Sequence, residues 1–355
     1  MALIRMILNH PTFHFSINFL LVSKNIKGLV LITGTTSGVG LNTLKPLLRF
    51  GWEVIAVNRS NKRAVKIAED FLTKEEVKNV HFIEIDLSNL DDVRKGCDEI
   101  LERFKKPINS LICNAAVYKP RLKRPERSAQ GFENSMAVNH FGHFLMINLL
   151  MENILSSERE IVLNGKSTVF KPRITVLGTV TANYSELGGR IPIPAPADLG
   201  DLSGFKNGFL PPISMANGKK FKPGKAYKDS KLCNMVTVQE LSKRYPAEKI
   251  IVNSLYPGCV ADTKLFRDTP WLFRFLFPIF QKFITKGYVS QRLAGERVAQ
   301  VATYKEFAKP SVHWSWGNRQ KTGRKAFSQK LSKRIVNTIT SQQTYDLTKQ
   351  LVGLD

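Results

Sequence analysis

A glycine-rich turn stands between a short apolar run and an amphipathic stretch near the start of this 355-residue chain. The run at 29–32 (LVLI) predicts a strand buried on both faces of a parallel sheet. The turn at 33–40 (TGTTSGVG) leads into a predicted helix at 41–51. This order is typical of a dinucleotide site, because backbone N–H groups at a helix N-terminus bind pyrophosphate. The candidate cofactor-binding residues of the turn are Gly34, Thr36, Ser37, Gly38, Val39 and Gly40.

Five further apolar runs predict strands, at 52–57, 81–85, 110–113, 173–177 and 250–255. They alternate with helical stretches, which indicates a doubly wound parallel sheet with right-handed crossovers. We therefore predict an α/β fold with a single Rossmann-like domain over 28–355. Residues 1–27 form an N-terminal extension whose role the sequence leaves open.

The residues after the second predicted strand favour NADP(H) over NAD(H). NAD-binding folds usually carry an acid there that holds the ribose hydroxyls. This chain instead reads NRSNKR at 58–63, and Arg59 and Lys62 are suited to pairing with a 2′-phosphate. Asp86 ends the third strand and is a candidate acceptor for the adenine amine. Further candidate cofactor contacts are Leu87, Asn114 and Ala115.

A tyrosine and a lysine four residues apart are the candidate catalytic pair. Tyr227 and Lys231 open a predicted helix and therefore share one face of it. A nearby ammonium favours the phenolate and lowers the pKa of a tyrosine, which is ordinarily near 10. A chance surface pair is the alternative, and the nucleotide turn at the other end of the chain argues against it.

Over about 28–310 the chain resembles the short-chain dehydrogenase/reductase superfamily. The resemblance rests on the glycine turn, Asp86, NAA at 114–116, Asn139 in AVNHFGHF, and the Tyr227/Lys231 pair. It implies a catalytic tetrad of Asn, Ser, Tyr and Lys. In that tetrad Asn139 positions a water of the proton relay, while Lys231 bonds the nicotinamide ribose and tunes Tyr227.

The chain departs from the superfamily at two points. Thr181 stands where a serine is usual, so that a hydroxyl is retained. The 46 residues from Thr181 to Tyr227 imply an insertion at about 184–222, which we interpret as a substrate loop.

Longer strings resemble the light-dependent protochlorophyllide oxidoreductase family. They are AYKDSKLCNM (226–235), SLYPGCVADTKLFR (254–267), the apolar stretch at 270–290, HWSW (313–316) and LVGL (351–354). The resemblance implies light-driven, NADPH-dependent reduction of the C17–C18 double bond of protochlorophyllide to chlorophyllide. A hydride would reach C17 and a proton C18.

The same resemblance implies roles for residues near the pigment. Tyr227 is the expected proton donor and Cys259 the second candidate, between which the sequence does not decide. Tyr256 would bond the pigment, and Pro257 and Gly258 would contact the cofactor. Cys233 is a weaker candidate for the pocket, and a position in the helix core is the alternative.

A formal net charge of +24, from 53 basic and 29 acidic residues, calls for an anionic partner. The basic runs at 119–127, 219–231 and 319–334 show no regular interleaving with aromatic residues and no nucleic-acid-binding module, so nucleic acid is disfavoured. Peripheral contact with anionic membrane lipids is the hypothesis. Four cysteines without a CxxC pair predict no metal site.

The apolar stretch at 271–283 is predicted by default to pack in the core. The sharper hypothesis is a lid, at about 264–290, that covers a large pigment or touches a membrane. A helical extension is expected at the C-terminus. No run of 18 uninterrupted apolar residues occurs.

Two other functions stay open, a light-independent reductase of a lipophilic carbonyl such as a retinoid, and a non-catalytic NADPH-binding module. A homo-oligomer is possible on this evidence. The short leader favours a bacterial host over a plastid, with the protein cytoplasmic or peripheral on a photosynthetic (thylakoid) membrane.

Overall fold

A computed structural model of the chain describes residues 27–157, 160–190, 195–284, 288–315 and 328–354. Its centre is a seven-stranded sheet in the order β3-β2-β1-β4-β7-β8-β9, in which every neighbouring pair is parallel. The strands are β1 (Leu29–Thr33), β2 (Glu53–Asn58), β3 (Val80–Glu84), β4 (Ser110–Cys113), β7 (Arg173–Leu177), β8 (Ile251–Tyr256) and β9 (His313–Ser315). The α/β doubly wound sheet predicted from the alternating pattern is therefore confirmed.

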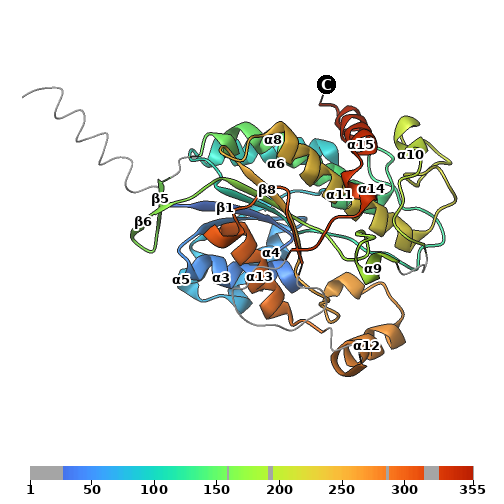
Figure 1. Ribbon diagram of the computed structural model, residues 1–355. Coiled ribbons are helices and arrows are strands. Elements are labelled where there is room, and N and C mark those ends of the chain that lie inside the picture. Colours follow the sequence, from blue (N-terminus) through green and yellow to red (C-terminus); the bar gives the residue numbers. More distant parts are fainter. Residues whose placement is uncertain (1–26, 158–159, 191–194, 285–287, 316–327, 355) are drawn as a thin grey trace, which may run out of the picture.

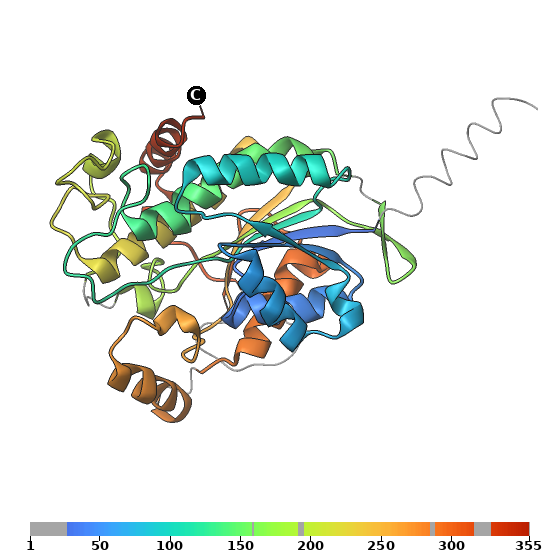
Figure 2. The same cartoon turned by 180° about the vertical axis from the view of Figure 1, so that it is seen from behind.

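Helices cover both faces of the sheet (Figures 1 and 2). On one face lie α3 (Gly38–Arg49), α4 (Asn61–Phe71) and α13 (Gln291–Thr303), with the short α5 (Lys74–Val77) after α4. On the other lie α6 (Leu90–Arg103), α8 (Gly142–Leu155) and α11 (Pro223–Arg244). Two hydrophobic clusters, one on each side of the sheet, form the core, because strands of a parallel sheet are apolar on both faces.

The C-terminal extension is helical, as expected. It consists of α14 (Lys333–Val336) and α15 (Thr338–Leu351), which pack against α11. Arg94 of α6 fixes the end of the chain, since its guanidinium donates to the carbonyl oxygens of Val352 (2.6 Å) and Gly353 (2.9 Å).

Two features of the strand pattern were not predicted. The hairpin of β5 (Glu160–Leu163) and β6 (Lys166–Val169) stands apart from the main sheet, and β9 adds a seventh strand at the edge beside β8. Both consist of strands of three or four residues, too short for an alternating pattern to identify. The predicted boundaries of the six other strands agree with the structure to within one residue.

The insertion and the region after β8 form the irregular end of the molecule above the carboxyl ends of the strands. The described parts of the insertion contain α9 (Leu187–Arg190) and α10 (Ser203–Lys206), with residues 191–194 outside the description. The region after β8 contains two short 3-10 or π segments, η3 (Lys264–Phe266) and η4 (Phe280–Ile284), on either side of α12 (Trp271–Ile279). The predicted extension at 1–27 lies outside the described residues except for Lys27.

Candidate active site

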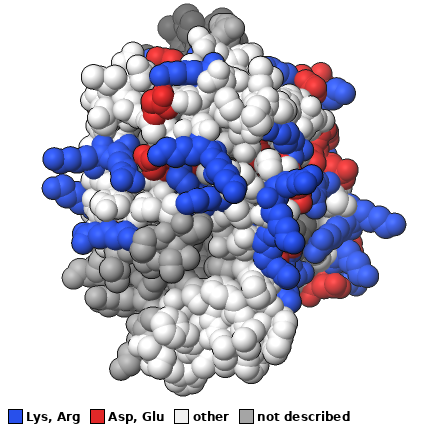
Figure 3. All heavy atoms as spheres, turned by 90° about the vertical axis from the view of Figure 1, so that its right-hand side faces the viewer, with Lys and Arg blue, Asp and Glu red and all other residues white. Residues whose placement is uncertain are grey.

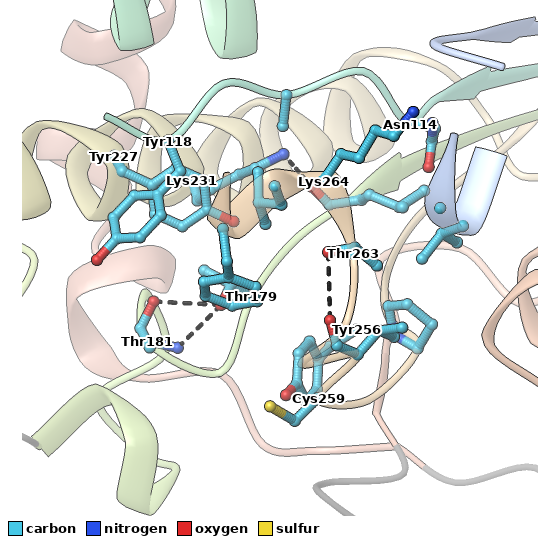
Figure 4. A pocket seen from close by; sticks show the side chains of 18 of the residues that line it. Asn114, Tyr118, Thr179, Thr181, Tyr227, Lys231, Tyr256, Cys259, Thr263 and Lys264 are labelled. Carbon is cyan, nitrogen blue, oxygen red and sulfur yellow. Dashed lines mark hydrogen bonds between the residues drawn. The ribbon is translucent and has the colours of Figure 1, made fainter. Parts of the chain in front are cut away.

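A cavity of about 530 Å³ opens where β1, β4, β7 and β8 end. Open α/β sheets bind ligands at this edge, outside the carboxyl ends of their strands. The glycine turn, the loops after β4 and β7, the start of α11 and the loop after β8 form its wall. Figure 4 shows Tyr227, Lys231, Thr181 and Cys259 brought together there from three separate parts of the chain.

The glycine turn has the geometry of a dinucleotide cradle. Gly34 and Gly38 adopt φ values of +75° and +60°, which only glycine takes without strain. A Cβ on Gly40 would lie 2.1 Å from the carbonyl oxygen of Gly34, so α3 starts as close to the turn as backbone allows. Ser37 makes no side-chain capping bond, and no acid lies in the first turn of α3. Its N-terminal N–H groups therefore suit an anion such as a pyrophosphate.

A buried asparagine that sequence reasoning missed holds this turn. The side chain of Asn58, at the end of β2, accepts from Thr35 N (2.7 Å) and donates to Thr35 Oγ1 (2.8 Å). Asn58 is the last residue of β2, at the position where NAD-binding folds usually carry an acid. That position was the one indication in the sequence that Asn58 belongs to the site. Its role is to fix the backbone that faces the cofactor.

The basic residues assigned to the 2′-phosphate lie next to Asn58. Arg59 and Lys62 are exposed and face solvent beside the turn rather than the described cavity wall. Such placement suits a phosphate at the outer end of a dinucleotide. Asp86 is partly buried, and its Oδ1 already accepts from Ser88 N (2.9 Å) and Ser88 Oγ (2.7 Å).

Tyr227 and Lys231 lie on the first turns of α11, which Pro223 starts at a position where proline is favoured. Both line the cavity. Lys231 is buried, and its Nζ donates to the carbonyl oxygen of Leu177 at 2.9 Å. Burial lowers the pKa of Lys231 to about 8.

The prediction that Lys231 lowers the pKa of Tyr227 is wrong for this structure. Burial, with the neighbouring Tyr118, raises the pKa of Tyr227 well above its usual value. The physical reason is that the low-polarity wall disfavours a phenolate, while the ammonium of Lys231 is directed to Leu177. The phenol therefore holds its proton at neutral pH, which is the state a proton donor requires.

Asn139 lies behind the cavity wall and is fully buried. It belongs to a π-helical turn, η2 (Ala137–Phe141), which follows the short α7 (Asn134–Met136) and runs into α8. Its side chain accepts from Val117 N (2.8 Å) and donates to Val117 O (3.1 Å) and Ser230 Oγ (3.0 Å). Such π-turns occur often at functional sites.

The remaining predicted residues divide between wall and core. Thr181 lines the cavity, and its Oγ1 lies 3.2 Å from that of Thr179. Tyr256 and Cys259 also line it, and burial raises the pKa of the Cys259 thiol to about 12. Cys233, on α11 itself, is fully buried in the core and does not line the cavity, so the core alternative holds and its assignment to the pocket is wrong.

The predicted residues therefore fall into two groups. Those that line the cavity are Gly34, Thr36, Ser37, Gly38, Val39, Gly40, Asn114, Ala115, Thr181, Tyr227, Lys231, Tyr256, Pro257, Gly258 and Cys259. Those that lie away from its described wall are Arg59, Lys62, Asp86, Leu87, Asn139 and Cys233.

An aromatic group that was not assigned from the sequence closes the cavity on the side of α12. Tyr118 packs edge-on against Tyr227, with ring centroids 5.0 Å apart, and also contacts Phe266 at 6.0 Å. Phe266 in turn contacts Phe277 at 5.5 Å. Together with Gln281, these rings form an apolar wall suited to a flat aromatic ligand.

The default prediction that 271–283 packs in the core is wrong. No residue of α12 is buried, and Trp271, Phe275 and Phe283 are 70%, 63% and 66% exposed. The stretch has apolar residues on more than one face, and only the face carrying Phe277 reaches the cavity. The lid hypothesis explains the face that reaches the cavity. It does not explain why the other faces of α12 are apolar and exposed to solvent.

Within the described ranges, no cluster of three or more His, Cys, Asp or Glu side chains could hold a metal ion. No helix in the same part of the chain is long and apolar enough to span a membrane. All four cysteines are free.

Comparison with solved structures places the fold. The chain matches 3-ketoacyl-(acyl-carrier-protein) reductase from Brucella melitensis, complexed with NADH, with a TM-score of 0.55 and 18% identity. That match covers 82% of this chain and 98% of the other. The RhlG/NADP active-site complex from Pseudomonas aeruginosa matches with a TM-score of 0.58 and 16% identity over 83% and 97% of the chains. At these identities the likeness shows the fold alone.

Comparison with family models and curated proteins is more specific. The family model described as short chain dehydrogenase matches residues 28–175. "Protochlorophyllide reductase, chloroplastic" from Cucumis sativus is 42% identical over 332 residues, which cover 92% of this chain and 78% of that protein. The protein of the same name from Pisum sativum is 42% identical over 333 residues, with the same coverage. With its parallel sheet, glycine turn and Tyr-Lys pair, the chain belongs to the protochlorophyllide reductase family of short-chain dehydrogenases/reductases.

Proposed function

We propose that this chain is an NADPH-dependent oxidoreductase that reduces the C17–C18 double bond of protochlorophyllide to chlorophyllide in light, as a step of chlorophyll biosynthesis. One observation carries the proposal. A single cavity joins the nucleotide turn to Tyr227, Lys231 and Cys259 and has a wall of aromatic rings. Relatives about 40% identical over 92% of the chain are named protochlorophyllide reductase.

In this proposal the cofactor and the residues of the site have separate roles. When bound, NADPH supplies the hydride. The turn at 34–40 would hold its pyrophosphate, Arg59 and Lys62 would pair with the 2′-phosphate, and Lys231, which donates to the carbonyl oxygen of Leu177, would bond the ribose. The pigment itself absorbs the photon, because its delocalised double bond accepts hydride poorly in the ground state.

Tyr227 is the proton donor in this proposal. Its phenol keeps the proton at neutral pH because burial raises its pKa. It faces the same cavity as Cys259, whose raised pKa also leaves it protonated. Tyr256 and Gln281 line the side on which the pigment would lie.

The test is a flash experiment on the purified full chain. The protein is mixed with NADPH and protochlorophyllide in darkness, and the absorption spectrum is recorded before and after one flash. We expect a red shift of the pigment band only after the flash and only with NADPH. Turnover of a retinoid carbonyl in darkness, without the light-dependent shift, would support the light-independent reductase instead. NADPH binding without either conversion would support the non-catalytic module.

We further propose that α12 and η4 dock on an anionic membrane surface. Their exposed apolar residues are Trp271, Leu272, Phe273, Phe275, Leu276, Ile279, Phe280, Phe283 and Ile284. Figure 3 shows an uncharged lobe at the lower end of the molecule, where α12 lies, beneath a band in which Lys and Arg gather. The exposed Lys264, Arg267 and Arg274 belong to the same region. An apolar helix beside basic residues suits the interface of a bilayer with anionic headgroups.

Sedimentation with vesicles tests this docking. Vesicles of phosphatidylcholine with phosphatidylglycerol should carry the full chain down, and Phe275→Ser should lower the bound fraction several-fold. Val169→Ser is the matched control, because Val169 is 76% exposed on the distant hairpin. Equal losses in both variants, or equal binding to vesicles of phosphatidylcholine alone, would contradict the proposal.

The proposed function also bears on where in the cell the protein acts. The relatives named above are chloroplastic, so the predicted preference for a bacterial host gains no support. We propose a photosynthetic membrane surface as the place of action. Self-association stays a prediction, which sedimentation velocity of the purified chain would test.

A further inference from the structure

The buried side chain of His143 has no part in the proposed chemistry, yet it lies between the nucleotide turn and Asn139. It stands on the first turn of α8 and is 2% exposed. Its Nε2 lies 2.8 Å from Thr33 Oγ1, at the end of β1. Its Nδ1 lies 3.1 Å from the carbonyl oxygen of Asn139.

The other partners of Thr33 fix the direction of these bonds. Thr33 Oγ1 accepts from the backbone N–H groups of Asn114 (3.0 Å) and Ala115 (2.9 Å), and both of these residues line the cavity. A hydroxyl has two acceptor positions and one proton. Because both acceptor positions are used, its proton goes to Nε2 of His143. The imidazole is therefore neutral and carries its own proton on Nδ1, from which it donates to Asn139. Burial lowers the pKa of His143 to about 3, in agreement with the neutral form.

Hydrogen bonds of Asn139 extend this network to α11, the helix that carries Tyr227 and Lys231. Its carbonyl oxygen accepts from His143 Nδ1 and from Asn234 Nδ2 (2.9 Å). Its side chain donates to Ser230 Oγ, and that hydroxyl donates to the carbonyl oxygen of Tyr227 at 2.8 Å. A continuous set of buried and part-buried hydrogen bonds thus runs from the loop after β4 to the first turns of α11.

We infer that His143 is a positioning residue that sets the catalytic helix relative to the nucleotide turn. It acts through Asn139, which serves as a brace. The carbonyl oxygen of Asn139 contacts two protein side chains, His143 and Asn234, and the position of a relay water stays a prediction. Only the turnover part of the following test rests on the proposed function, since cofactor binding is measured separately.

The experiment compares three variants of the full chain. His143→Leu removes both bonds, whereas His143→Gln keeps one acceptor and one donor. Thr175→Val is the matched control, because it removes a buried threonine bond to Asn253 (3.0 Å) outside this network. The dissociation constant for NADPH, the product formed per flash at saturating NADPH, and the midpoint of unfolding are measured for each.

We expect His143→Leu to raise the dissociation constant for NADPH about tenfold and to lower the product per flash several-fold, and His143→Gln to recover part of both. Thr175→Val should lower only the midpoint of unfolding. Wild-type affinity and yield in His143→Leu, or equal losses in Thr175→Val, would overturn the inference. If His143→Leu does not fold, His143→Asn takes its place, since the shorter side chain cannot reach both partners. A wild-type protein that binds NADPH but forms no product would count against the proposed function alone.

Discussion

Replacing Gly40 by alanine should separate the affinity for NADPH from the stability of the fold. The new Cβ would lie 2.1 Å from Gly34 O and 2.5 Å from Asn114 Nδ2. Carbon atoms do not approach backbone oxygen closer than about 3 Å, so the start of α3 must move by roughly 1 Å. Overpacking of this kind costs about 1–3 kcal/mol, and the higher helix propensity of alanine returns about 1 kcal/mol. The net loss of unfolding free energy is therefore about 0–2 kcal/mol.

The loss of affinity should be larger than this. The N–H groups of the first turn of α3 bind pyrophosphate only when they point at it, and a shift of about 1 Å can cost on the order of a hundredfold. We expect the dissociation constant for NADPH, measured by its fluorescence, to rise at least tenfold. The control is Gly165→Ala in the hairpin, where φ is +75° and no atom lies within 4 Å of the new Cβ. It should cost about 1 kcal/mol of stability through strain and leave binding unchanged. Wild-type affinity in Gly40→Ala would refute the assignment of the cradle.

Three other perturbations test separate parts of the account. Tyr227→Phe should spare NADPH binding and slow the proton transfer that follows a flash, and undiminished turnover would remove Tyr227 as the donor. Arg59→Ala should weaken NADPH binding about fivefold and NADH binding little, since an exposed charge-assisted bond is worth about 1 kcal/mol, and equal weakening would defeat the 2′-phosphate assignment. Burial raises the pKa of Glu133 to about 7, so the folded protein keeps a proton that the unfolded chain releases above pH 4.5. Titration of Glu133 should therefore contribute a fall of about 3 kcal/mol to the free energy of unfolding as the pH rises from 4.5 to 7. Denaturant titrations of Glu133→Gln should lack this contribution, and a pH dependence identical to that of the wild type would contradict it.

Most of the sheet and the two ends of the cavity could be predicted because each depends on residues close together in the sequence. The apolar run at 29–32 and the three glycines after it specify strand, turn and helix within twelve residues. Tyr227 and Lys231 lie on one face of α11 because four residues make about one helical turn. Chain topology then brings both ends to one edge of the sheet.

The missed features depend on contacts between distant segments. Tyr118 reaches Tyr227 across more than a hundred residues, and Asn58 matters because Thr35 lies against it. The strand β9 forms because β8 offers it a free edge. The apolar residues of α12 gave no indication of whether protein or solvent covers them, since burial is a property of the folded chain.

The pKa of Tyr227 likewise depends on contacts between distant segments that the local sequence does not reveal. The spacing of Tyr227 and Lys231 predicted a lowered phenol pKa, but burial and the neighbouring Tyr118 raise it, while the ammonium of Lys231 is directed to Leu177. The sequence by itself determined the α/β class and the glycine turn and predicted the reacting groups, because these depend on local backbone geometry and side-chain chemistry. Tertiary structure alone decided the direction of the pKa shift of Tyr227, the hydrogen-bond partners of Asn139 and the exposure of α12. Each of these depends on which distant atoms replace water around a group.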